Sequence, residues 1–160
     1  MNTDRVLAVQ FLEGGGKPLP LASNPLARAL AGELLELDAE RGSALLAFTP
    51  PQQFLQGAGV IQGGIVAALL DFAMAFAALA ALGGADRPFA TATLQVSLMK
   101  PAPPGRYLAR GRIVRKGRRL MFAEAALAPA PEAARGQDGA RAPDAATVAT
   151  ASAVMPFTDS

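Results

Sequence analysis

The chain contains no cysteine, no histidine and no tryptophan among its 160 residues. Without cysteine and histidine it cannot build a disulfide framework, a thiolate nucleophile, a zinc site with His or Cys ligands, or a catalytic triad that contains histidine. Any catalytic group must therefore be a carboxylate, a hydroxyl, an amide or a basic side chain. We expect no metal and no cofactor, and the absence of cysteine fits a cytoplasmic location.

Charge is also scarce and dispersed. The formal net charge is +2, and the basic residues are not gathered into a block with interleaved aromatic residues, so no nucleic-acid partner is expected. The first residues lack the long apolar segment of a secretory signal. The apolar run from Ile65 to Leu82 raises the question of a membrane span, but Asp71 inside it would cost about 2.5–3.5 kcal/mol near a bilayer centre. We therefore expect a helix buried in protein, and no membrane.

Residues 1–160 are expected to form a single domain, because 51% of them are hydrophobic, enough for one core and a subunit interface. Hydrophobic periodicity, with glycine and proline at the boundaries, predicts helices over 25–31 and from Gly63-Gly64 to about Leu82. It predicts strands over 33–38, 43–49, 89–99, 106–116, 119–128 and 145–157. The segment 129–145 is rich in proline, alanine, glycine and charge, which predicts a flexible loop. Segregation of helices from strands along the chain favours an α+β fold with an antiparallel sheet.

Asp71 stands out because it is the one charged residue between Arg41 and Asp86, within the most apolar predicted helix. A buried carboxylate without partners is costly, so this one must be hydrogen-bonded, protonated or directed into a pocket. Perturbed carboxylates often mark functional sites, which makes Asp71 a catalytic candidate. The alternative is a structural carboxylate that ties the helix to the sheet.

Gly63 and Gly64 precede the long helix and form the second candidate feature. The first amides of a helix have no acceptor inside the helix, so they can bind a carbonyl oxygen or an anion, although most double glycines are simply turns. Eight residues at 1.5 Å each place Gly63 about 12 Å from Asp71, too far for both to act on one carbonyl. If both are catalytic, two chains must contribute to one site, which predicts a two-fold dimer.

The spacing Gln56-x-x-Gly59-x-x-Gln62-Gly63-Gly64-x6-Asp71 resembles the signature of hotdog-fold acyl-CoA thioesterases of the phenylacetate-degradation and 4-hydroxybenzoyl-CoA thioesterase type. The resemblance extends over most of the chain, and includes the turns from Pro101 to Gly105 and at Gly117-Arg118. It implies a long central helix wrapped by a curved antiparallel sheet, in dimers that often associate as tetramers. It also implies that the acyl-CoA substrate carries its own CoA and that hydrolysis needs no further cofactor.

The resemblance assigns roles to individual residues. Asp71 would attack the thioester carbonyl or activate water, the Gly63 amide would polarise that carbonyl from the neighbouring subunit, and Gln56 would contact the thioester or position water. Gln62 and Gly64 would contribute to substrate binding beside Gly63. Basic residues near the subunit edge would meet the CoA phosphates, and the candidates are Lys116, Arg118 and Arg119, unless they are only the solvated tip of a hairpin.

Two groups of residues carry open alternatives. Thr91, Thr93 and Gln95 lie on the small polar side of a predicted strand, where they could line the acyl pocket, cover Asp71 or form an ordinary sheet face. The apolar lining expected around the site, with the helix residues Phe72, Met74 and Phe76 available, favours a medium or aromatic acyl group.

Gln62 is a departure from the family pattern, which usually has histidine at this position. A glutamine can donate and accept hydrogen bonds but cannot titrate, so any proton handling by that residue is lost. We expect the core machinery of Asp71 and the Gly63 amide to survive. The first alternative is a hotdog domain that binds acyl-CoA without hydrolysing it. A second is a dehydratase or isomerase of acyl thioesters, which is weaker because such enzymes usually use histidine.

Overall fold

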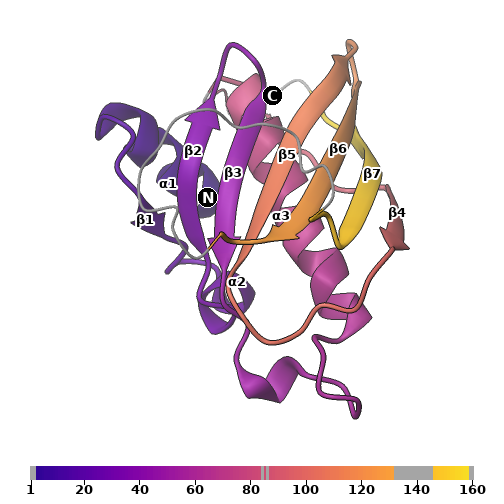
Figure 1. The fold of residues 1–160 in the computed structure, drawn as a ribbon. Coiled ribbons are helices and arrows are strands. Elements are labelled where there is room, and N and C mark those ends of the chain that lie inside the picture. Colours follow the sequence, from indigo (N-terminus) through magenta and orange to yellow (C-terminus); the bar gives the residue numbers. More distant parts are fainter. Residues whose placement is uncertain (1–2, 84, 86, 132–145, 159–160) are drawn as a thin grey trace.

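The computed structural model describes residues 3–83, 85, 87–131 and 146–158, so the greater part of the predicted loop 129–145 lies outside the described residues. The described residues form a curved, seven-stranded antiparallel sheet with one long helix against one face (Figure 1). This confirms the predicted α+β class and the central helix wrapped by a sheet.

The elements follow one another as α1 (Thr3–Glu13), β1 (Leu19–Pro20), α2 (Pro25–Ala29), β2 (Glu33–Asp38), β3 (Ser43–Phe48), the 3₁₀ turn η1 (Gln52–Phe54), α3 (Gly63–Ala81), β4 (Thr93–Leu98), β5 (Tyr107–Lys116), β6 (Leu120–Pro129) and β7 (Ala149–Pro156). The strand order in the sheet is β1-β2-β3-β5-β6-β7-β4, with every neighbouring pair antiparallel. β4 therefore forms one edge of the sheet and pairs only with β7 among the described strands.

The structure differs from the predicted elements in segments where hydrophobic periodicity is weak or the element is very short. The sequence did not predict α1, which buries only Ala8 and Phe11 and whose apolar residues are weakly segregated to one side. β4 is shorter than the predicted strand 89–99, because Phe89 instead forms an isolated bridge with Phe157. The two-residue strand β1 and the turn η1 were not predicted either, since elements this short carry no periodicity.

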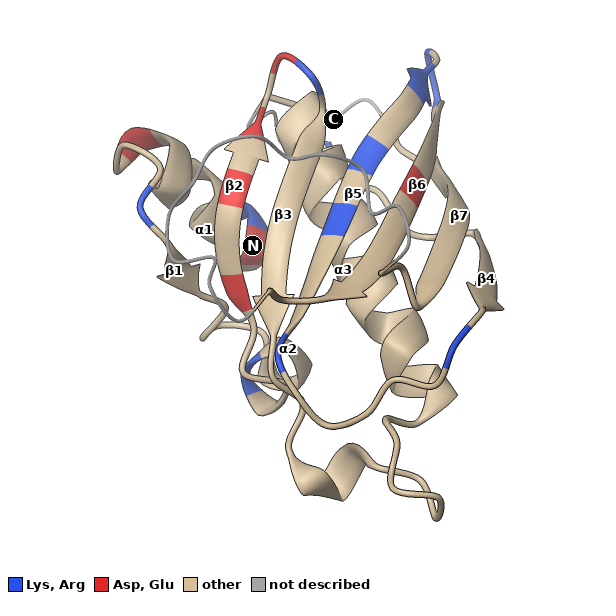
Figure 2. Cartoon of the chain, viewed as in Figure 1, with Lys and Arg blue, Asp and Glu red and all other residues tan. Residues whose placement is uncertain are grey.

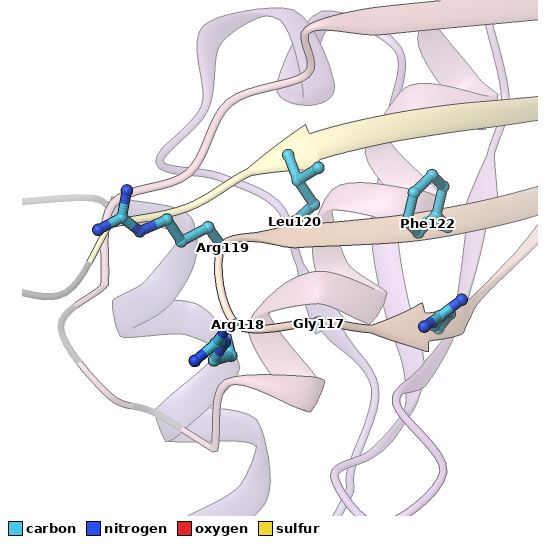
Figure 3. Close-up of a pocket in the computed structure, with 6 residues that line it drawn as sticks. Gly117, Arg118, Arg119, Leu120 and Phe122 are labelled. Atoms are coloured by element: carbon cyan, nitrogen blue, oxygen red, sulfur yellow. The ribbon is translucent and has the colours of Figure 1, made fainter.

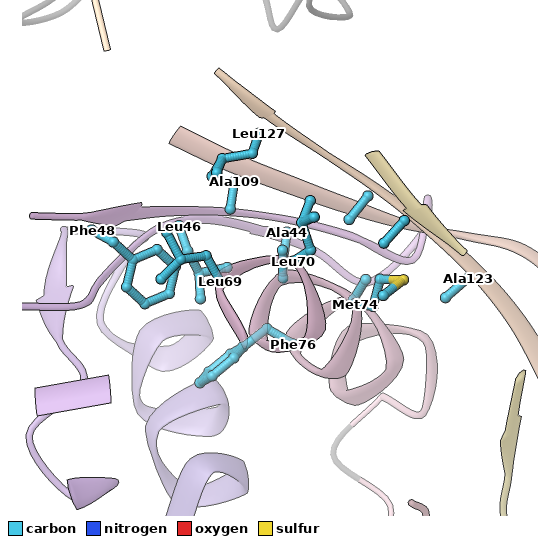
Figure 4. Packing of buried hydrophobic residues seen from close by; sticks show 14 of the residues in the cluster. Ala44, Leu46, Phe48, Leu69, Leu70, Met74, Phe76, Ala109, Ala123 and Leu127 are labelled. Atoms are coloured by element: carbon cyan, nitrogen blue, oxygen red, sulfur yellow. The ribbon is translucent and has the colours of Figure 1, made fainter. Parts of the chain in front are cut away.

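Helix α3 supplies most of the core from its buried side. Its side chains pack mainly on β3, β5 and β6, where Leu69, Leu70 and Met74 meet the inward residues of the sheet (Figure 4). Each fully buried large apolar side chain stabilises the fold by about 1.5–3 kcal/mol. By length and composition α3 could cross a membrane, but 56% of its most apolar window is buried inside the fold, as in the core helix of a globular domain.

Two of the predicted pocket residues belong to this core instead. Met74 is 0% exposed and Phe76 is 1% exposed, so neither lines an open pocket, and that part of the prediction is wrong. Full burial follows from their positions on α3, since Met74 faces the sheet and Phe76 lies on the side of the helix away from the sheet (Figure 4). Phe72 is half-buried, and its ring lies 5.9 Å from that of Phe48 between centroids.

A glycine sets how closely α3 approaches the sheet. Gly111 of β5 lies directly under α3, and a Cβ at this position would overlap the backbone carbonyl of Ala73. Helix and strand therefore touch backbone to backbone, two residues from Asp71. Any other residue at this position would force the helix away from the sheet.

Candidate functional site

Asp71 lies in the middle of α3 and is half-buried. The hydroxyl of Thr91 donates a hydrogen bond of 2.8 Å to Asp71 Oδ1. Thr91 therefore contacts Asp71, which was one of the roles that the sequence left open for it. A hydrogen bond from a neutral donor orients a carboxylate without neutralising its charge, so Asp71 Oδ1 is held in place while Oδ2 is not engaged by this bond.

The start of α3 is fixed from two sides by backbone hydrogen bonds. The amide of Gln62 donates to Phe54 O at 2.9 Å, and the amide of Ile61 donates to Ala102 O at 2.8 Å. Gln62 is the N-cap residue, its carbonyl accepts from Ile65 and Val66, and its exposed side chain makes no capping bond. The Gln62 side chain is therefore available to other partners.

Gly63 and Gly64 form the first turn of α3. Among the described residues neither backbone N–H has an acceptor. The first N–H groups of a helix point along its axis and carry the positive end of the helix dipole. This is the donor arrangement that an oxyanion or a polarised carbonyl requires.

Gln56 lies in the turn that leads to α3. Its Oε1 accepts a hydrogen bond of 2.8 Å from the amide of Ala58, and its backbone amide donates to Val60 O. The turn closes through Gly59, whose φ of +76° is the left-handed conformation that glycine adopts readily. The side-chain oxygen of Gln56 is thus committed to the turn, whereas its amide nitrogen is not part of that bond.

β4 runs alongside α3 in the opposite direction. At one end, Thr91 just before β4 contacts Asp71, and at the other end Leu98 lies against the start of the helix. A Cβ placed on Gly63 would lie only 2.8 Å from Leu98 Cδ1. Asp71 and Gly63 of α3 therefore each lie beside one end of the edge strand.

Thr93 and Gln95 lie on the other face of β4. Their cross-strand partners Val154 and Ser152 lie outside the core cluster, while Leu94 and Leu98 pair with the core residues Ala153 and Ala149. The sheet therefore separates Thr93 from Asp71 within one chain, and of the three polar residues only Thr91 meets the carboxylate. Thr91 differs because it precedes the regular strand, so the two-residue alternation does not include it.

Basic residues lie at the tip of the β5–β6 hairpin (Figure 2), where they line a pocket (Figure 3). Its volume is about 810 Å³, and Arg118 and Arg119 extend from the turn in different directions. It is lined by Arg115, Gly117, Arg118, Arg119, Leu120 and Phe122. Two of the three residues predicted to meet phosphate thus face this pocket.

Lys116 has a different position. A bulge in β5 between Ile113 and Arg115 shifts the register, so that Lys116 pairs with the core residue Met121 and turns toward the helix side. Its Nζ donates a hydrogen bond of 2.6 Å to Ala81 O in the last turn of α3. A cation at this end of a helix stabilises the carbonyls that have no partner inside the helix.

The sequence did not single out Leu98 or Phe122. Leu98 is 56% exposed and Phe122 is 42% exposed, although both are large and apolar. Exposure of such residues follows from strand position: Leu98 is on an edge strand, and Phe122 faces outward beside the β5 bulge. The alternation of Leu94, Val96 and Leu98 with polar residues was the available signal that Leu98 lies on the helix side of the strand.

Comparison with known proteins finds one family match and one related sequence. Residues 58–129 match the family model of the thioesterase superfamily, a segment that contains Gly63, Asp71 and Thr91. A proposed esterase of Saccharolobus solfataricus is 26% identical over 88 residues, and the match covers 55% of this chain and 61% of that protein. This chain thus spans less than two thirds of that relative's length.

Solved structures with the same fold cover nearly the whole chain. A proposed thioesterase of Ralstonia eutropha, related to phenylacetic acid degradation, is 29% identical, with a TM-score of 0.69 and coverage of 93% of this chain and 98% of that one. The PaaI protein of the E. coli phenylacetic acid degradation operon is 18% identical, with a TM-score of 0.69 and coverage of 95% and 94%. A thioesterase family protein of Silicibacter pomeroyi is 22% identical, with a TM-score of 0.72 and coverage of 94% and 97%. The chain thus has the hotdog fold of these proteins, and its segment 58–129 is similar to the thioesterase superfamily.

Proposed function

We propose that this protein hydrolyses acyl-CoA thioesters to a free acid and CoA. The observation that carries the proposal is the lone carboxylate of Asp71 in an apolar helix, with one oxygen held by Thr91. A carboxylate used only as a structural tie would be expected to have both oxygens bound and to be fully buried, whereas Asp71 is half-buried. The match of residues 58–129 to the thioesterase superfamily supports a hydrolase, and acyl-CoA as the substrate is the more specific part of the proposal.

The second element of the site is the pair of amides at the start of α3. Gly63 and Asp71 are about 12 Å apart along one helix, so one chain cannot present both to a single carbonyl. We place the site between two chains related by a two-fold axis. One chain would supply Asp71 and the other Gly63, because a nucleophile and its oxyanion donor must each lie about 3 Å from the reacting group.

The edge strand β4 offers the surface for this pairing. Among the described residues its outer edge has no strand partner, and Leu94 and Leu98 on its helix side are 38% and 56% exposed. If β4 pairs antiparallel with its copy, the Thr91 end of one strand lies opposite the Leu98 end of the other. Asp71 of one chain then approaches Gly63 of the partner. We also propose that two such dimers can associate as a tetramer.

The chemistry then follows from the two groups. A carbonyl oxygen that accepts from the Gly63 N–H is polarised, and the negative charge that develops on it is stabilised by this amide. Asp71 either attacks the carbonyl carbon, giving a mixed anhydride that water cleaves, or takes a proton from an attacking water. In both routes the C–S bond breaks. In the first route CoA leaves as the thiolate and takes a proton from water, and in the second Asp71 passes to the sulfur the proton that it took from water. Gln56, Gln62 and Gly64 surround the same carbonyl as hydrogen-bonding neighbours.

The hairpin pocket is proposed to hold the phosphates of CoA. Arg118 and Arg119 present guanidinium groups that bind phosphate oxygens in a bidentate manner. Lys116 is assigned to the end of α3 instead, because its ammonium is already bonded to Ala81 O. No further cofactor is required for hydrolysis, and the proposed location is the cytoplasm.

Thiol release from short, medium, long and aromatic acyl-CoAs tests the proposal. Wild type should release thiol from at least one of them, and Asp71→Asn, which keeps the shape but not the charge, should be about 10²–10⁴ times slower. Asp38→Asn is the matched control, because this carboxylate serves the β2–β3 turn, where it accepts from Arg41 N. Its rate should stay near that of wild type.

The main rival is an acyl-CoA-binding domain without hydrolysis, favoured by a glutamine at position 62 where the relatives' pattern has histidine. Tight binding of intact acyl-CoA, with no thiol release from wild type, would replace the hydrolase by this binding function.

Mixing of subunits tests the shared site. Asp71→Asn chains lack the carboxylate, and Gly63→Pro chains lack the donor N–H. If the site spans two chains, unfolding and refolding equal amounts together should restore about one quarter of wild-type activity, because half of the dimers are mixed and each has one intact site. Activity no higher than that of the separate variants would refute the two-chain site while leaving the hydrolysis itself standing.

A further inference from the structure

Leu98 occupies an unusual place beside the proposed oxyanion donor. It is the most exposed of the large apolar residues on β4, yet its Cδ1 would lie 2.8 Å from a Cβ on Gly63. Its cross-strand partner Ala149 is a core residue, so Leu98 projects to the helix side of the sheet. The proposed pairing of β4 with its copy gives Leu94 and Leu98 an apolar surface to cover, but it does not account for the position of Leu98 directly beside Gly63.

Simple geometry relates Leu98 to the substrate. A Cβ lies within about 2.5 Å of its own backbone nitrogen, so Leu98 Cδ1 is at most about 5.3 Å from Gly63 N. A carbonyl oxygen hydrogen-bonded to this N–H lies about 2.9 Å away, and the carbonyl carbon about 1.2 Å farther. The carbonyl carbon and the Leu98 methyl group thus both lie within about 5 Å of one backbone nitrogen, which makes Leu98 the large apolar side chain beside the place where acyl C2 would lie.

We propose that Leu98 determines substrate specificity by limiting the width of the acyl group at C2. This inference rests on the proposed hydrolysis of acyl-CoA. An isobutyl side chain beside the amide admits a methylene at C2 and obstructs a second carbon substituent there. The preferred substrates are then straight-chain acyl thioesters, and thioesters branched at C2 are disfavoured because they cannot bring their carbonyl to Gly63.

Butyryl-CoA and isobutyryl-CoA are the probes, because they are isomers that differ only in branching at C2. The measured quantity is the ratio of kcat/KM for isobutyryl-CoA to that for butyryl-CoA. Leu98→Ala should raise this ratio about tenfold, the scale at which pockets discriminate single carbon groups, and Leu98→Phe should lower it. Because each ratio is taken within one variant, changes in dimer stability or in the fraction of active protein cancel.

Val114→Ala is the control, since Val114 is also an exposed apolar strand residue, 50% exposed, on β5. Its ratio should match that of wild type. Should Leu98→Ala be inactive, the milder truncation Leu98→Val is measured in its place, with the same expected direction.

The possible results distinguish a wrong role for Leu98 from a wrong assignment of hydrolysis. Equal ratios in wild type and in the Leu98 variants, with hydrolysis intact, would overturn the role of Leu98 and leave the thioesterase in place. Absence of thiol release from every acyl-CoA with wild type would overturn the proposed function and this inference together.

Discussion

Removal of a single backbone N–H provides the sharpest test of the site. Gly63→Pro deletes the proposed oxyanion donor and leaves Asp71 untouched. The backbone tolerates this change, because proline is favoured at the first position of a helix and Gln62 already has the extended φ of −56° and ψ of 134° that precede proline. Proline here should therefore not unfold α3.

The comparison must exclude crowding, since any side chain at this position approaches Leu98 Cδ1 to 2.8 Å. Gly63→Ala adds the same Cβ but keeps the N–H, and it is the matched control. Leu98 is 56% exposed and can rotate away in either variant. The difference between alanine and proline then measures the donor alone.

Loss of one oxyanion donor costs about 2.7–4 kcal/mol of transition-state stabilisation, or 10²–10³ in kcat. We expect Gly63→Pro to fall below Gly63→Ala by this factor in the thiol-release assay, with little change in KM and an unchanged circular dichroism spectrum. A proline variant within about tenfold of the alanine variant would refute the assignment of the Gly63 amide.

The remaining predictions concern Thr91 and the hairpin. Thr91→Val removes the 2.8 Å bond to Asp71 and should lower kcat by about tenfold or more without raising KM, whereas Thr91→Ser should retain activity; equal loss in both variants would contradict an orienting hydroxyl. Replacement of Arg118 and Arg119 by alanine should raise KM for acyl-CoA and weaken its salt dependence, but not alter KM for an acyl-pantetheine that lacks the nucleotide. Lys116→Met should lower the melting temperature and leave KM unchanged, because its partner is Ala81 O.

The main elements of the fold could be predicted because their patterns are strong. α3 is a long apolar segment between Gln62-Gly63-Gly64 and Gly83, whose φ is +61°, and its bounds follow from these residues. α1 could not be predicted, since its stability depends on packing of Ala8 and Phe11 against the rest of the fold and little on its own pattern.

The candidate site was predictable in its composition but not in its arrangement. A lone carboxylate and a double glycine are visible in the sequence, and their separation along one helix is the basis for proposing a site shared by two chains. The sequence could not show that Thr91 contacts Asp71 and Thr93 does not. The difference arises because regular pairing of β4 begins at Thr93, so Thr91 is outside the alternation that places Thr93 on the opposite face of the sheet. Nor could the sequence show that Lys116 faces the helix side of the sheet while Arg118 and Arg119 face the pocket. Lys116 takes this face because of the β5 bulge, and no residue type in this segment marks the bulge.

The contact of Gly111 with Ala73 has a consequence for how this protein can change over evolutionary time. Because main chain rests on main chain there, the height of α3 above β5 does not depend on the sizes of the surrounding side chains. Residues around the proposed acyl site can then enlarge or shrink without tilting the helix that carries Asp71. A scaffold of this kind allows substrate range to diverge while the position of the proposed catalytic carboxylate is inherited unchanged.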